Sequence, residues 1–170
     1  MTGDVLTIRG RVAAKFGDNV DTDLIYPGRY LNITDRLKTA EHLFELAWPE
    51  IRAALGPGDI LVAGRNFGCG SSREQAAAAV KYAGVGAVIA VSFARIFFRN
   101  AINLGLPVVV SAGAPLDLQP GDELELDLTG GTILNSATGQ VWSSAPLDPR
   151  AVDLLHAGGL VQYLKAKFAA

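Results

Sequence analysis

The stretch of this chain with the clearest chemical potential is a glycine-rich loop at residues 64–74, which reads GRNFGCGSSRE. It follows a short apolar run and precedes an alanine-rich segment with helical character. Where a strand passes into a helix in this way, unpaired backbone N–H groups and the positive end of the helix dipole favour a bound carboxylate or phosphate. Arg73 adds a planar guanidinium suited to binding a carboxylate through two hydrogen bonds.

The same residues also fit a purely structural interpretation. Ser71 and Glu74 have the spacing of a capping box, in which two side chains satisfy the free N–H groups of a helix and no ligand is needed. Spacing alone leaves capping and ligand binding equally open. The loop is not a nucleotide P-loop, because no lysine follows its last glycine, and it lacks the glycine pattern and later acid of a dinucleotide-binding turn.

The elements around this loop predict a small parallel sheet. Three apolar runs of strand length alternate with two helical segments, which is typical of a buried βαβαβ block. The block covers about residues 58–112, with strands at 60–64, 85–92 and 107–111 and helices at 71–83 and 93–104.

The rest of the chain predicts antiparallel strands and further helices. Leu124, Leu126 and Leu128 alternate with acidic residues, as in a strand with one buried face. The whole is therefore expected to be one mixed α/β domain over residues 1–170. Its other elements are a strand at 5–12, antiparallel strands between 120 and 142, one or two helices at 39–55 depending on Pro49, a helix at 148–156 and an amphipathic segment ending near Phe168.

Charge, hydropathy and cysteine content exclude several classes of function. Fifteen basic and seventeen acidic residues give a net charge of -2, and no run of like charges could form a nucleic-acid arm or a basic membrane patch. The start of the chain lacks a signal-peptide pattern and no apolar run reaches about 18 residues, so we expect a soluble cytoplasmic protein. Cys69 is the single cysteine, so this chain alone cannot supply the thiolates of an iron-sulfur cluster.

Four separated blocks carry a more specific signal than any spacing. They read GDNVDTD at 17–23, YLN at 30–32, NFGCGSSRE at 66–74 and SFARIFFRN at 92–100. In this order they resemble the small subunits of 3-isopropylmalate dehydratase, a family that is similar to the swivelling domain of aconitase. The resemblance spans most of residues 17–110. It implies a three-layer β/β/α swivelling domain, in which the parallel block and an antiparallel β layer belong together.

The resemblance also implies a hydro-lyase activity. The family isomerises 2-isopropylmalate to 3-isopropylmalate by dehydration and rehydration in leucine biosynthesis. It implies a large-subunit partner, in a heterodimer or heterotetramer, that carries a four-iron, four-sulfur cluster, whereas this chain binds no cofactor. Ser71 matches the family's catalytic base, Asp23 an active-site aspartate, and Ser72 and Arg73 the substrate-binding pair. Asn32 stands where relatives that bind a second charged arm have Arg, which favours a shorter or apolar arm.

The sequence leaves other interpretations of the substrate and of the function open. Gln75 replaces the His that the family most often has after Arg-Glu, so the identity of the malate is open. Small subunits of homoaconitate hydratase and of a dimethylmalate or citramalate dehydratase belong to the same class. A noncatalytic anion-binding domain, in which Ser71 and Arg73 only hold a ligand, belongs to another. Arg95 and Arg99 lie four residues apart in the sequence, where they could meet an anion, the partner or only solvent.

Overall fold

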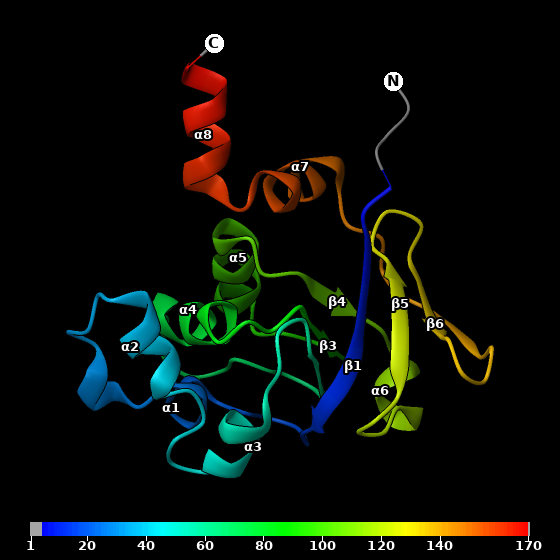
Figure 1. Ribbon diagram of the computed structural model, residues 1–170, viewed down its shortest axis with the longest axis horizontal. Coiled ribbons are helices and arrows are strands. Elements are labelled where there is room, and N and C mark those ends of the chain that lie inside the picture. The colour runs from blue at the N-terminus through cyan, green and yellow to red at the C-terminus, as the bar shows by residue number, and fades with distance from the viewer. Residues whose placement is uncertain (1–4, 170) are drawn as a thin grey trace.

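The computed structural model describes residues 5–169; residues 1–4 and 170, which the single-domain prediction also included, lie outside the described part. Within it, seven strands form one mixed sheet in the order β4-β3-β2-β1-β5-β6-β7 (Figure 1). Strands β1 to β4 are parallel, and β1, β5, β6 and β7 are antiparallel. The strands are β1 (Thr7–Lys15), β2 (Ile60–Ala63), β3 (Ala87–Ala90), β4 (Val108–Val110), β5 (Glu123–Asp127), β6 (Thr132–Asn135) and β7 (Val141–Ser143).

Strand β1 joins the parallel and antiparallel halves. Its first residues pair with β5, from Thr7 opposite Asp127 onward, and its last residues pair with β2, ending with Lys15 opposite Val62. The register with β2 shifts between Val12 and Ala14. An irregularity of this kind bends a strand and increases its twist, so one strand can serve both halves.

Two hydrophobic cores lie on opposite faces of the parallel strands. Side chains alternate along a strand, so in β2 Leu61 and Ala63 belong to one core while Ile60 and Val62 belong to the other. Helices α4 (Glu74–Tyr82) and α5 (Arg95–Leu104) contribute to the first core, and strands β5 and β6 to the second. The predicted three-layer β/β/α arrangement is therefore confirmed.

Most helices lie close to their predicted positions. The segment predicted as one or two helices is two, α2 (Arg36–Glu41) and α3 (Pro49–Ala54), and α7 (Pro149–Ala157) and α8 (Leu160–Phe168) follow the antiparallel strands. Three short elements were not predicted: α1 (Thr22–Ile25), the 3-10 helix η1 (Gly28–Tyr30) and α6 (Ala114–Asp117). Each has at most four residues, too few for a periodic pattern to appear. No helix within residues 5–169 is long and apolar enough to cross a membrane.

The loop between β2 and α4 is packed against α5 through aromatic side chains. Phe67 is fully buried, and its ring meets that of Phe97 edge to face with 5.2 Å between centroids. Gly68 follows with a φ of 82°, and a Cβ atom built on it would overlap the Phe97 ring. Glycine is required here both by the backbone conformation and by the close approach of the ring.

We expect Gly68→Ala to lower the free energy of unfolding by about 3 kcal/mol, because it combines a left-handed backbone with a clash in a packed core. Gly139→Ala is the matched control, since Gly139 has a φ of 76° and open space around its Cα. The control should cost only about 1 kcal/mol, from the backbone alone. Urea unfolding of both variants measures the difference, and equal losses would contradict the packing argument.

Candidate active site

Loops from neighbouring parallel strands meet where those strands end, the edge at which α/β sheets commonly bind ligands. The loop after β1 and the loop after β2 run side by side and are joined by backbone hydrogen bonds of 2.8 to 3.1 Å. The pairs, donor first, are Gly64 and Gly17, Asn19 and Arg65, Gly68 and Val20, and Thr22 and Cys69. Two of the four sequence blocks are thereby held together along their length.

The loop after β3, which contains the first three residues of the fourth sequence block, holds the other side of the β2 loop. The N–H of Phe67 donates to the Ser92 carbonyl at 3.1 Å, and the N–H of Ala94 donates to the Phe67 carbonyl at 2.9 Å. The Ser92 hydroxyl also accepts from the N–H of Asn66 at 2.8 Å. The glycine-rich loop is thus fixed from both sides before it reaches Ser71.

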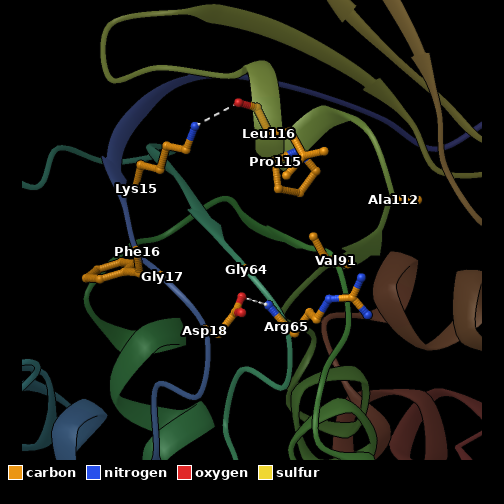
Figure 2. A pocket seen from close by; sticks show the side chains of 10 residues that line it. All are labelled: Lys15, Phe16, Gly17, Asp18, Gly64, Arg65, Val91, Ala112, Pro115 and Leu116. Carbon is orange, nitrogen blue, oxygen red and sulfur yellow. Dashed lines mark hydrogen bonds between the residues drawn. The ribbon is translucent and has the colours of Figure 1, made fainter.

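A cavity of about 330 Å³ opens beside the start of these loops, as Figure 2 shows. At its base, Asp18 Oδ1 accepts from the backbone N–H of Arg65 at 2.6 Å, and at its upper wall Lys15 Nζ donates to the Leu116 carbonyl at 3.2 Å. Val91 and Pro115 line it between these polar groups. None of the predicted site residues lines this cavity, so the candidate site lies further along the same two loops.

Ser71 does not cap α4. The helix begins only at Glu74, its N-cap is Arg73, and no side chain accepts a hydrogen bond at that end. The Ser71 Oγ atom lies 3.1 Å from Oγ1 of Thr22 instead, while the residue as a whole is exposed. The capping interpretation is therefore wrong, and the predicted helix start at residue 71 is three residues too early.

Arg73 and Asp23 form an ion pair across the two loops, from Nη1 to Oδ1. The Arg73 side chain is 25% exposed and that of Asp23 is 58% exposed, so the pair sits at the surface with the guanidinium more sheltered. Gly28 lies directly against this guanidinium, since a Cβ at that position would be 2.9 Å from Nη1. A charge-assisted bond of this kind restricts the orientation of the arginine.

The structure brings together three of the five predicted site residues through side-chain contacts: Ser71 lies against the first loop at Thr22, and Arg73 pairs with Asp23 there. Ser72 is exposed between Ser71 and Arg73. Thr22 and Gly28 are the contacts that the sequence analysis missed. Thr22 stood inside a matched block, but nothing in its spacing distinguished it from a structural threonine.

Asn32 lies apart from this group. It is exposed after η1, and in the described part of the chain no hydrogen bond joins it to Ser71 or Arg73. The preceding turn is anchored by Tyr30, whose ring stacks on His42 at 3.6 Å and whose hydroxyl donates to Glu45 at 3.0 Å. Gln75 helps to line a hollow of about 210 Å³ near Ile33.

The described residues do not form a metal-ligand set. Among residues 5–169, no group of three or more His, Cys, Asp or Glu side chains is placed to hold a metal ion. Cys69 is half-buried, and its backbone forms a bridge with Asp21. Arg95 and Arg99 are exposed on α5.

Comparison with known proteins identifies the family. Residues 49–113 match the aconitase C-terminal domain family. The chain is 52% identical to the 3-isopropylmalate dehydratase small subunit of Aquifex aeolicus over 96% of this chain and 98% of the relative. It belongs to the family of 3-isopropylmalate dehydratase small subunits. The crystal structure of a 3-isopropylmalate dehydratase from Methanocaldococcus jannaschii matches with a TM-score of 0.87 and 43% identity, over 96% of each chain.

Members of this family carry names with different substrates. The methanogen homoaconitase small subunit of Methanothermobacter thermautotrophicus is 54% identical over 93% of this chain and 91% of its own length. The isopropylmalate/citramalate isomerase small subunit of Methanocaldococcus jannaschii is 50% identical over 95% of this chain and 96% of its own length. Overall similarity therefore fixes the family and leaves the substrate to be argued from the site.

The hydrogen bond between the Asp18 carboxylate and the Arg65 N–H should contribute measurably to the stability of the two loops. Asp18→Ala removes the acceptor of the Arg65 N–H, so we expect the unfolding free energy to fall by about 1 kcal/mol and the Arg65 amide to exchange its hydrogen faster. Asp18→Asn keeps an acceptor oxygen and should retain most of the protection. Amide hydrogen exchange checks both variants; unchanged protection of Arg65 in Asp18→Ala would argue against this contribution.

Proposed function

We propose that this chain is the small subunit of a hydro-lyase that interconverts 2-isopropylmalate and 3-isopropylmalate, and that Ser71 is its base. Family membership supports the reaction class. The observation that supports the base is the position of Ser71, an exposed residue whose hydroxyl has no capping role and which stands two residues before Arg73. A noncatalytic anion site would use the same hydroxyl only as a hydrogen-bond donor, so turnover is the measurement that separates the two functions.

A serine can act as the base in this reaction only if its alkoxide is stabilised, and the loop offers groups that can do this. The proton to be removed lies on a carbon next to a carboxylate and is only weakly acidic, so a serine base must have a stabilised alkoxide. Oriented donors around a developing anion provide such stabilisation at little cost in reorganisation. The donors available here are the backbone N–H groups of the loop, the start of α4 and the guanidinium of Arg73.

Substrate binding is assigned to Ser72 and Arg73. The guanidinium can hold a substrate carboxylate through two parallel hydrogen bonds, which fixes both position and orientation. Asp23 keeps that guanidinium in place from the neighbouring loop, so its carboxylate acts in the active site by orienting Arg73. Positioning of this kind contributes to rate because the reacting atoms must be aligned before proton transfer.

The proposed enzyme also requires a large subunit. Relatives named small subunits support a second chain. In this proposal the four-iron, four-sulfur cluster belongs to that partner, as the family resemblance implies. When bound there, the cluster supplies a Lewis acid for the departing hydroxyl. The steps assigned to this chain are confined to holding a carboxylate and moving one proton.

Loss of the base should separate catalysis from assembly. In the complex with the large subunit, we expect Ser71→Ala to lower kcat by about 10³-fold while the complex still forms and KM changes little. Ser136→Ala, an exposed serine in the turn after β6, is the matched control and should keep wild-type kcat. Full turnover by Ser71→Ala would refute the base, whereas no turnover by the wild-type pair would favour the noncatalytic anion-binding domain.

We further propose an uncharged substrate arm, because Asn32 stands where relatives that bind a second charged arm have Arg, and a neutral amide does not offer a carboxylate that cationic partner. The reconstituted enzyme should therefore turn over 2-isopropylmalate and prefer it to homoaconitate-type tricarboxylates by at least about 10²-fold in kcat/KM. Asn32→Arg should reduce this preference, and Asn32→Gln serves as the uncharged control. Activity restricted to a tricarboxylate would overturn this role of Asn32.

A further inference from the structure

The hydroxyl of Thr22 is buried and faces the proposed base. Thr22 is 2% exposed, and its Oγ1 atom lies 3.1 Å from Oγ of Ser71. Within the described residues this is the only hydrogen bond that the Thr22 side chain makes. A buried hydroxyl is costly without a partner, and the contact with Ser71 supplies one.

Thr22 is held firmly relative to the loop that carries Ser71. It is the first residue of α1, whose N-terminus is capped by the carboxylate of Asp21 through the N–H of Leu24 at 2.9 Å. The N–H of Thr22 donates to the carbonyl of Cys69 at 2.8 Å, two residues before Ser71. These two bonds fix the backbone of Thr22 relative to the loop that carries Ser71.

The direction of the hydrogen bond follows from the role of the base. Either hydroxyl can donate while both carry a proton. Once Ser71 has lost its proton, only Thr22 can donate, and the oxygen of Ser71 must accept. A donor fixed in place before the reaction stabilises the anionic form without having to reorganise.

We propose that Thr22 is a positioning residue for the base: its buried hydroxyl donates to Ser71 Oγ, stabilises the alkoxide and leaves the outward lone pairs free for the substrate proton. This inference rests on the proposed function of Ser71. It assigns no contact between Thr22 and the substrate, because Thr22 is buried and Ser71 is exposed.

The test compares variants of Thr22 in the complex with the large subunit, using 2-isopropylmalate as substrate. Thr22→Val keeps the branched shape and removes the donor, so kcat should fall about 10²-fold with KM within about twofold of wild type. Thr22→Ser keeps the donor and should retain kcat within about threefold, although it loses a buried methyl group. Thermal unfolding of each variant checks the fold, and Thr22→Ala replaces Thr22→Val if the valine variant does not fold.

A pH profile distinguishes positioning from packing. Without its donor the alkoxide is less stable, so the acid limb of the kcat profile should move to higher pH in Thr22→Val and stay in place in Thr22→Ser. In a Ser71→Ala background, Thr22→Val should cause no further loss, because the two hydroxyls act as one unit.

Two results would overturn the role of Thr22 while leaving the proposed function intact. One is a Thr22→Val enzyme with wild-type kcat and pH profile alongside an inactive Ser71→Ala. The other is an equal loss in Thr22→Ser and Thr22→Val, which would assign the effect to disturbed packing around Thr22, because Thr22→Ser retains the donor. Failure of the proposed function has a different signature, since Ser71→Ala would then turn over as fast as wild type.

Discussion

The backbone hydrogen bonds between the loops after β1 and β2 are the constraint on which the site depends. Because the β2 loop is committed to this pairing as far as Cys69, the chain enters α4 only at Glu74. Ser71 and Ser72 are left between the paired segment and the helix, outside any regular hydrogen-bonding pattern. An exposed serine two residues before an arginine is a direct result, and Gly68 and Gly70, which both have positive φ, allow the backbone to follow that path.

Local pattern was sufficient for the parallel block because apolar runs and helical segments alternate there without ambiguity. It failed at Ser71, where the Ser-x-x-Glu spacing suggested a cap and long-range pairing with residues 17–22 decided otherwise. Thr22 was invisible for the same reason, since its partner lies 49 residues away in sequence. Short elements such as α1 and η1 escaped because a few residues carry no period, although they position Asp23 and the turn before Asn32.

The two hydrophobic cores on opposite faces of the sheet differ in their relation to the candidate site. The core under α4 and α5 holds the loops in register through Phe67 and its aromatic neighbours, while the opposite core under β5 and β6 has no residue of the candidate site. Substitutions in the second core are therefore expected to act on stability alone. The ion pair of Asp23 with Arg73 links the two loops, and it also orients the guanidinium to which we assign substrate binding.

The double pairing of β1 also affects how the chain can be made. Its parallel partner β2 begins about 45 residues after the end of β1, whereas its antiparallel partner β5 comes only after β4 and α6. During synthesis the parallel block can form while one edge of β1 still has no neighbour. An open edge of this kind invites association with other chains, so the emerging polypeptide passes through a stage in which chaperones or slow synthesis would favour correct folding.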